Sequence, residues 1–178
     1  HTVIQKSNNH VIGSKIQAKL ASLPKISVLP QISPLQKEEN IRSIDYVKAN
    51  LSSHLSSNHF RNQLSIFYND YFDEFKSLAE ESWPGLQIIN LEGRSNLPDQ
   101  PIELMVRDGD FVAEIGWMGH GLQMWLQTMW FITRSKDSST IILDEPDVYM
   151  HPDLQRKLLR FIRSRNPQCL IATHSTEI

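Results

Sequence analysis

The sequence predicts an α/β protein whose core is a parallel sheet. Two observations support this fold class: short apolar runs without alternation at residues 140–143 and 168–173, and an amphipathic helical pattern between them at residues 152–163. A continuous apolar run is typical of a strand buried on both faces, as in a parallel sheet that helices cover. A strand, a helix and a second strand within about 30 residues form one βαβ unit, in which the two strands run parallel.

The helix of this unit begins at Pro152, because a first helical position does not need the N–H that proline lacks. Leu154, Leu158 and Ile162 recur every four residues and build one apolar stripe. The helix is therefore expected to pack this stripe against the sheet.

Polar residues follow both strands of the unit. Residues 140–143 run directly into Asp144 and Glu145, and Pro146 ends the strand because it has no backbone N–H to donate. The second strand ends on His174. Ligands of open α/β sheets bind just beyond the carboxyl ends of the strands. We therefore expect Asp144, Glu145 and His174 at one edge of the sheet, where paired acids hold a cation or activate water.

Three motifs in this region resemble those of ABC-type ATPases. The run I-I-L-D-E-P-D, which ends at Asp147, resembles a Walker B strand with its catalytic Glu and the following D-loop. The run A-T-H-S around His174 resembles the switch-histidine loop. Residues 119–123, G-H-G-L-Q, are similar to the signature motif of the soluble branch that includes SMC-like and RecF-like ATPases and the overcoming-lysogenization-defect (OLD) nucleases. Three motifs in the family's order over residues 117–178 are far more specific than one.

The resemblance implies a role for each residue after the Walker B strand. Asp144 is the implied magnesium ligand. Glu145 is the implied general base that polarises the water attacking the γ-phosphate. His174 contacts the γ-phosphate or that water, and Asp147 occupies the D-loop position that crosses a dimer interface.

The signature-like run implies contacts with a nucleotide held by the other protomer. Gly119, His120, Gly121 and Gln123 are the expected binding residues, so ATP and Mg²⁺ are the implied cofactors and a homodimer is the implied assembly. Gly119 takes the place of the usual signature serine, and the contact then falls to backbone amides at the helix start. No G-x-x-x-x-G-K-[ST] loop occurs in the sequence. We therefore expect this chain to be the C-terminal half of an ATPase domain that takes its Walker A loop from elsewhere.

The resemblance also divides the chain. A partial P-loop NTPase-like core is predicted for residues 1–35 and 83–178. Residues 36–82 have the spacing of two amphipathic helices and are predicted to form a helical hairpin insertion. Such an insertion is either purely structural or, as in the family, a surface that meets partners or DNA. Trp117, Trp125, Met129, Trp130 and Phe131 are expected in the core rather than on a base-stacking surface.

A few antiparallel strands are predicted between the insertion and the signature-like run. Residues 86–91, 102–106 and 111–115 read as strands, and Asp108 and Gly109 form a strong hairpin-turn signal. A short helix over residues 15–21 and a surface loop over residues 96–101 complete the expected elements.

Composition restricts the class of protein. The 178 residues are 40% hydrophobic and 21% charged, as in a globular domain, and the net charge of −2 gives no general attraction to nucleic acid or anionic membranes. The single cysteine, Cys169, lies in a predicted buried strand, so no disulfide framework exists. Residues 118–132 are apolar but too short to span a bilayer, and no signal peptide is recognised. A cytoplasmic protein without a membrane segment is expected.

Three functions fit these features. The favoured one is ATP hydrolysis by a dimerising ABC-type domain of the RecF/OLD-like branch that drives nucleic-acid processing, in DNA repair or anti-phage defence, with a nucleic acid or nuclease as partner. The second is a non-catalytic assembly module with an ATPase-like fold. The third is a metal-dependent phosphoesterase using Asp144, Glu145 and His174. A zinc site from His151, Asp153 and His174 is disfavoured, because no closely spaced ligand pair occurs.

Overall fold

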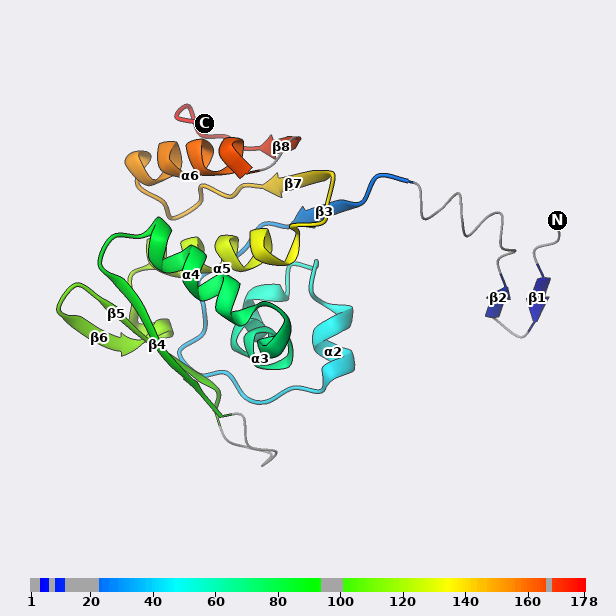
Figure 1. Ribbon diagram of the computed structural model, residues 1–178, viewed down its shortest axis with the longest axis horizontal. Helices are drawn as coiled ribbons and strands as arrows, with labels where there is room; N and C mark the ends of the chain where they lie inside the picture. The colour runs from blue at the N-terminus through cyan, green and yellow to red at the C-terminus, as the bar shows by residue number, and fades with distance from the viewer. Residues whose placement is uncertain (1–3, 7–8, 12–22, 94–100, 166–167) are drawn as a thin grey trace.

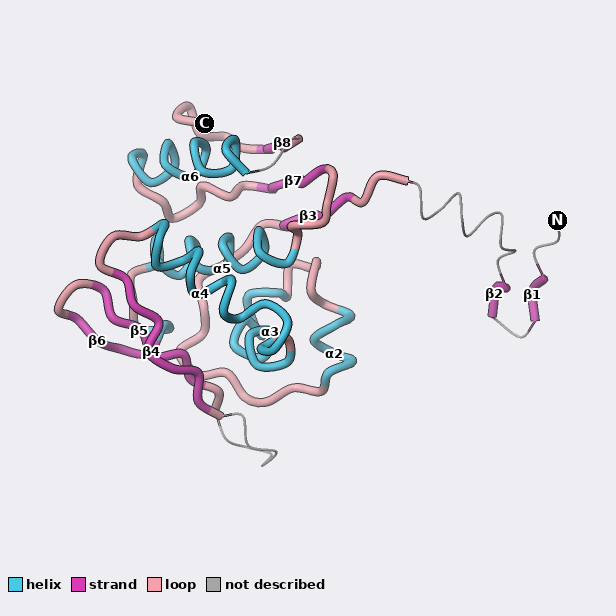
Figure 2. The backbone as a smooth tube through the Cα atoms, viewed as in Figure 1, coloured by secondary structure: helices cyan, strands magenta, loops and turns pink. Residues whose placement is uncertain are grey.

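The computed structural model contains a parallel sheet, a separate antiparallel sheet, and helices that fill the space between them (Figure 1). The chain contains both helices and strands, with a parallel sheet joined by a helix, and this mixed α/β fold confirms the predicted class (Figure 2). The structure describes residues 4–6, 9–11, 23–93, 101–165 and 168–178.

The parallel sheet positions the residues of interest. α6 (Pro152–Arg165) connects its last two strands, so the predicted βαβ unit is confirmed. The register places Asp144 opposite Ala172, and the carboxyl ends of the strands reach the same edge of the sheet (Figure 1). The strands, in spatial order, are β3 (Ile26–Leu29), β7 (Thr140–Asp144) and β8 (Cys169–Ala172).

One face of this sheet is buried and the other is open. Ile141 and Leu143 are buried in the same hydrophobic cluster as the apolar stripe of α6. Cys169 is only half-buried. The expectation that helices cover both faces is therefore wrong for the described part of the chain. The apolar residues on the open face are Ile26, Val28 and Leu170, which are 57%, 39% and 53% exposed.

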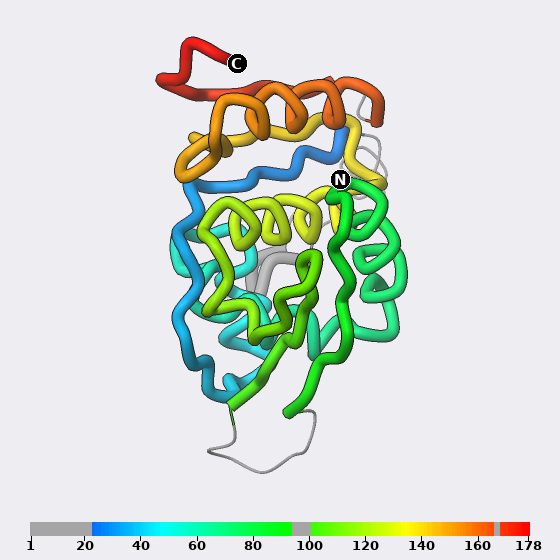
Figure 3. The backbone as a smooth tube through the Cα atoms, turned by 90° about the vertical axis from the view of Figure 1, so that its left-hand side faces the viewer, coloured from blue at the N-terminus to red at the C-terminus, as the bar shows by residue number. Residues whose placement is uncertain are grey.

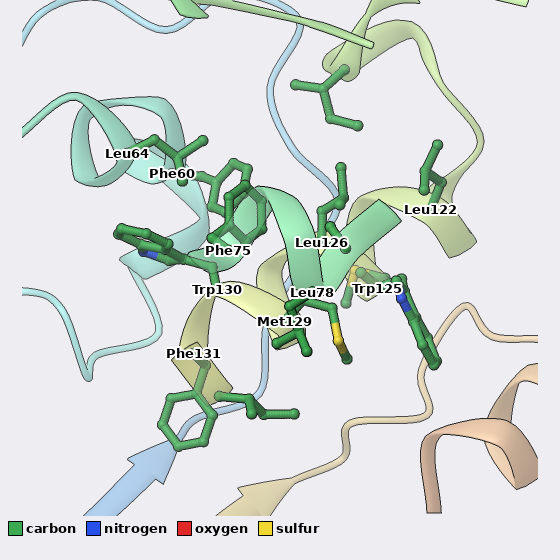
Figure 4. Close-up of a cluster of buried hydrophobic side chains, with 14 of the residues drawn as sticks. Phe60, Leu64, Phe75, Leu78, Leu122, Trp125, Leu126, Met129, Trp130 and Phe131 are labelled. Atoms are coloured by element: carbon green, nitrogen blue, oxygen red, sulfur yellow. The ribbon is translucent and has the colours of Figure 1, made fainter. Parts of the chain in front are cut away.

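α5 (His120–Arg134) is the central helix of the core, between the parallel sheet and the helices formed by residues 44–82 (Figure 3). Its two tryptophans, Trp125 and Trp130, are buried (Figure 4). The Trp125 indole N–H donates to Ser82 Oγ at 2.9 Å, and that of Trp130 donates to Gln63 Oε1 at 2.9 Å. Each large apolar ring thus enters the core with its polar atom paired.

Four of the five predicted core residues are confirmed and one is wrong. Trp125, Met129, Trp130 and Phe131 are buried. Trp117, however, is 61% exposed, and the Lys37 ammonium lies 4.0 Å from its ring centroid. The reason is local, because Trp117 lies in a 3₁₀ turn that precedes α5 and not in the buried helix itself.

Residues 36–82 are mostly helical, as predicted, but the predicted pair of helices is wrong in number and length. The first helix is short because Ser43 caps its start and the cap at Asn50 ends it. Farther on, a π-helical turn interrupts the second run, which has more apolar residues than one regular helical stripe holds. The segments are α2 (Ile44–Ala49), η1 (Ser56–His59), α3 (Phe60–Ile66), η2 (Tyr68–Phe72) and α4 (Asp73–Ser82).

The antiparallel sheet leads the chain into α5. The predicted hairpin is present and turns at Gly109, which has φ of +60°, but Asp108 pairs with Phe111 and so belongs to the strand and not to the turn. After the last strand comes the 3₁₀ turn η3 (Ile115–Trp117), and α5 follows directly. The sheet thereby fixes where α5 begins. Its strands are β4 (Leu86–Glu92), β5 (Glu103–Asp108) and β6 (Phe111–Glu114).

Two short strands, β1 (Ile4–Lys6) and β2 (Asn9–Val11), pair antiparallel near the start of the chain. The helix predicted for residues 15–21 and nearly all of the loop predicted for residues 96–101 lie outside the described residues. Among the helices that the structure describes, none combines the length and apolar character needed to cross a membrane.

The buried His59 makes the fold sensitive to acid. Its ring is fully buried, and burial lowers its pKa, so it is neutral in the folded state below about pH 6.5, where an unfolded histidine binds a proton. The unfolded state then carries more protons, so the free energy of unfolding falls as pH decreases below about 6.5, by at most about 1.4 kcal/mol per pH unit. Urea unfolding from pH 7.5 to 5 measures this slope.

The variant His59→Gln should flatten the slope. The matched control, His54→Gln, changes an exposed histidine of the same segment and should leave the slope unchanged. Equal slopes for both variants would show that His59 is not the sensitive group.

Candidate functional site

The edge of the parallel sheet brings the two acids and the late histidine together, as predicted. Asp144 is exposed, and its side chain makes no hydrogen bond or ion pair with any other described residue. The Glu145 backbone N–H donates to the Ala172 carbonyl at 2.8 Å and so extends the strand pairing by one residue. Glu145 Oε1 lies 3.4 Å from His174 Nε2, and the His174 side chain is 98% exposed. Three groups able to bind or activate a ligand therefore share one accessible edge.

The backbone that carries Glu145 is strained. Glu145 has φ of +48° and Tyr149 has φ of +65°, in the left-handed region that residues other than glycine rarely adopt. Each such residue costs about 1–3 kcal/mol, and such strain persists where surrounding contacts determine the conformation. The two residues bracket a turn that starts at Pro146. The strain fixes the direction in which the chain leaves β7 and in which Glu145 projects.

Asp147 is held inside this turn. It is only 7% exposed, and Thr173 Oγ1 donates to its Oδ1 at 2.5 Å. The Ser175 backbone N–H in turn donates to Thr173 Oγ1 at 2.9 Å. Asp147 therefore joins the turn after β7 to the loop that carries His174, a contact within the chain that its predicted D-loop role did not include.

The start of α5 lies next to the same turn. Gly119 is the N-cap and supplies no side chain for capping, and the exposed His120 lies edge-on to Tyr149 with ring centroids 5.3 Å apart. A Cβ at Gly119 would meet no atom within 4 Å, and one at Gly121 would make only ordinary contacts at 3.7 Å. Packing does not require glycine at either position. The absence of side chains instead leaves the first amides of α5 open to a close ligand.

Gln123 differs from its predicted role. It is 1% exposed, and its Oε1 accepts from the Leu35 N–H at 2.7 Å. Its Nε2 donates to the Met118 carbonyl at 2.7 Å and to the Gly116 carbonyl at 3.3 Å. One turn into α5, this side chain faces inward, and the structure does not bring it to the surface with Gly119 and Gly121.

A cleft of about 430 Å³ joins the start of α5 to the start of α6. Gly121 and Tyr149 both line it, so the glycine run and the strained turn form one continuous surface. The His151 ring accepts a hydrogen bond from the Asp153 N–H at 3.4 Å, so His151 caps the start of α6. The remaining lining residues are Trp83, Leu154 and Lys157.

The side chains at the sheet edge fit Mg²⁺ better than zinc. Mg²⁺ keeps several waters and takes one or two carboxylate oxygens beside phosphate, and the free carboxylate of Asp144 suits this mode. Throughout the described ranges, no three His, Cys, Asp or Glu side chains gather closely enough to hold a metal on their own. The zinc alternative with His151, Asp153 and His174 is therefore not supported.

One further residue at this edge was missed from the sequence. Gln31 is exposed and follows β3 by two residues. Leu29, the last residue of β3, pairs with Leu143 of β7, so Gln31 reaches the same edge as Asp144. The rule about strand ends, applied to β3 as it was to β7 and β8, is the signal that would have found it.

Comparisons with known proteins agree with this geometry. A family profile described as "AAA domain, putative AbiEii toxin, Type IV TA system" matches residues 16–178. A solved structure from work on ATP-driven dimerization and DNA-stimulated activation of SMC ATPases has a TM-score of 0.51 and 14% sequence identity, and the match covers 66% of this chain and 74% of that chain. That likeness shows a shared fold.

Other solved structures are matched over smaller parts of their length. The Smc head domain with an extended coiled coil bound to the C-terminal domain of ScpA, from Pyrococcus furiosus, has a TM-score of 0.46 and 15% identity, with coverage of 73% of this chain and 36% of that chain. The Smc head domain with a coiled coil and joint from Pyrococcus yayanosii has a TM-score of 0.43 and 19% identity, with coverage of 73% and 25%. No curated protein sequence matches the chain.

The Asp147–Thr173 bond can be tested by removing one hydroxyl. Thr173→Val leaves the buried carboxylate without its donor and should lower the free energy of unfolding by about 1–3 kcal/mol. Thr173→Ser keeps the hydroxyl and serves as the matched control. Thermal unfolding of both variants measures the difference, and equal stabilities would mean that the hydroxyl does not hold Asp147.

Proposed function

This chain belongs to the AAA-domain family described for AbiEii-type proteins of type IV toxin–antitoxin systems, and from this premise we propose that it hydrolyses ATP as one half of a dimer. The observation that carries the proposal is the shared edge of Asp144, Glu145 and His174, next to the open amides of α5. Its fold is that of an SMC-like ATPase head, with a partial P-loop NTPase-like core.

The groups at the sheet edge divide the work of hydrolysis. Bound Mg²⁺ would neutralise charge on the phosphates, and Asp144 supplies the carboxylate that holds it directly or through water. Glu145 accepts the proton of the attacking water, because its carboxylate projects at the end of β7, where a γ-phosphate would lie. His174 donates a hydrogen bond to the phosphate or to that water. The exposed amide of Gln31 is a further ligand for the water or the metal.

The signature-like residues 119–121 have a separate role, which is to contact a second nucleotide molecule. The positive end of the α5 dipole and the open amides at Gly119 and Gly121 suit a phosphate. We propose that they cap the nucleotide held by a second protomer, with His120 at the rim. The SMC ATPases of the matched structure dimerise when driven by ATP, which supports this assembly.

The biological role is proposed from the family. The family description concerns a toxin of a toxin–antitoxin system, which favours anti-phage defence over DNA repair within the RecF/OLD-like branch. A nucleic acid or a nuclease is the proposed partner, and the cytoplasm the proposed location. This sequence lacks a Walker A loop, so turnover is proposed only for a longer chain that supplies one.

A non-catalytic assembly role is the rival, and the lack of a Walker A loop in the sequence is the observation that favours it. Glu145→Gln separates the two roles. In the full-length protein this variant should lower MgATP turnover by at least about 100-fold, as expected for loss of a general base, and keep ATP binding and ATP-dependent dimerisation. Phosphate release and light scattering measure the two properties.

The control for this variant is Glu103→Gln, which changes an exposed acid of β5 far along the chain from the edge. It should hydrolyse ATP at the parental rate. Undiminished turnover in Glu145→Gln would remove Glu145 from its role, and no turnover in the parental protein would favour the assembly role.

Asp144→Asn tests the metal ligand. The amide keeps the shape of the side chain but loses its charge, so the Mg²⁺ concentration for half-maximal turnover should rise by about tenfold or more. Turnover measured across a magnesium titration gives this value. An unchanged titration curve would show that Asp144 does not bind the metal.

A further inference from the structure

The loop of residues 116–119 decides where α5 presents its amides. It lies between β6 and α5, and its backbone is hydrogen-bonded by two side chains, Glu114 of β6 and Gln123 of α5. If α5 caps a nucleotide, as proposed above, the position of this loop sets the quality of that contact. The question is therefore which residues hold it.

Arg61 of α3 is the centre of one set of contacts. Its guanidinium is fully buried and donates to both oxygens of Glu114, from Nε to Oε1 at 2.6 Å and from Nη2 to Oε2 at 2.8 Å. Nη1 donates to Glu39 Oε2 at 3.2 Å, and Nη2 also reaches the Gln36 carbonyl at 3.0 Å. Five donors in a rigid plane suit such a fixed arrangement.

The charges in this cluster hold one another in place. Burial by itself lowers the pKa of Arg61, but the hydrogen bonds and charges of Glu114 and Glu39 raise it, so the guanidinium stays protonated. Burial raises the pKa of Glu39, and hydrogen bonds from Asn62 and Arg61 oppose that rise. Removing one member of such a buried group costs several kcal/mol, because the others lose their compensation.

Glu114 links Arg61 to the backbone of the loop. Its Oε2 accepts a hydrogen bond from the Gly116 N–H at 2.7 Å. A Cβ at Gly116 would lie 2.8 Å from Arg61 Nη2 and 2.8 Å from the Gln36 carbonyl, so only glycine leaves room for the guanidinium. The helical segment, residues 36–82, thus touches the loop backbone itself.

Gln123 is the second residue that holds the loop of residues 116–119. It bonds the carbonyls of Gly116 and Met118 from within α5 and the Leu35 N–H from the chain that leads out of β3. The loop is consequently tied to the sheet edge on one side and, through Arg61, to the helical segment on the other.

We propose that Arg61 and Gln123 are positioning residues for ATP turnover: they join the helical segment to the loop that presents α5, without touching nucleotide. This proposal rests on the proposed function for its catalytic consequence. Displacement of the helical segment, for example by a bound partner, would move the loop and thereby change how α5 caps the nucleotide.

The test uses two conservative variants of the full-length protein. Arg61→Lys keeps the charge but loses the paired contact with Glu114, and Gln123→Met keeps the approximate volume but loses three hydrogen bonds. Both should speed amide hydrogen exchange at Gly116 and Met118, whose N–H groups are hydrogen-bonded, by about tenfold, the equivalent of one or two net hydrogen bonds. The control, Lys136→Met, breaks the exposed ion pair with Glu74 and the contact with the Tyr71 ring, neither of which involves the loop, and should leave exchange unchanged.

The same variants are then compared in ATP-dependent association and turnover. Both should weaken association and lower kcat by about tenfold, while the nucleotide affinity of the monomer stays at the parental value. A merely structural role would lower thermal stability but leave exchange at the loop, association and kcat unchanged, and this result would overturn the proposal.

Failure of the proposed function gives a different pattern. In that case the parental protein neither associates with ATP nor hydrolyses it, whereas the exchange measurement needs no nucleotide. Faster loop exchange in Arg61→Lys and Gln123→Met would then show that these residues hold the loop, but that the loop has no role in ATP turnover. Unchanged exchange would show that they do not hold the loop either.

Discussion

The parallel register between β7 and β8 is the constraint on which the site depends. Asp144 pairs with Ala172, and the Glu145 N–H continues the pairing by donating to the same Ala172 carbonyl. This bond brings the Glu145 carboxylate within 3.4 Å of His174. A slip of one residue would turn every side chain of one strand to the opposite face, so the acid and the histidine would no longer meet.

Contacts between the segments that follow the strands stabilise the arrangement of Glu145 and His174 that this register produces. The Asp147–Thr173 bond joins the segments that follow β7 and β8, and the left-handed residues Glu145 and Tyr149 lie on either side of Asp147 in the first of these segments. Strain of this kind is paid for by neighbouring contacts and recurs at sites where a side chain must point in one direction. Here the direction is outward, toward the edge.

Much of this edge could be predicted from sequence because its determinants are local. The apolar run before Asp144 and the run before His174 identify strands, and the rule about strand ends brings their polar residues together. The hairpin at Gly109 was also predictable, because a two-residue turn with positive φ selects glycine. In such cases a few adjacent residues contain all the information.

Two of the errors originate in contacts between distant parts of the chain. Gln123 turns inward because its amide pairs with Leu35, 88 residues earlier, and no local pattern records that partner. The open face of the parallel sheet likewise depends on which elements pack against it. Trp117 is different, because its exposure has a local cause in the short turn before α5. The periodicity of apolar residues predicts which residues share a face of a helix or strand, but it does not predict which other element packs against that face.

Exposure also separates two kinds of polar residue that a motif presents as equal. His174 and Asp144 are exposed and have spare hydrogen-bonding capacity, whereas Asp147 and Gln123 are buried with their polar atoms engaged inside the chain. The first kind is free to act on a ligand, and the second kind holds the first in position. Because desolvated polar atoms must find partners, the buried motif residues form the supporting framework, and a nucleotide would meet only the exposed ones and the bare amides of α5.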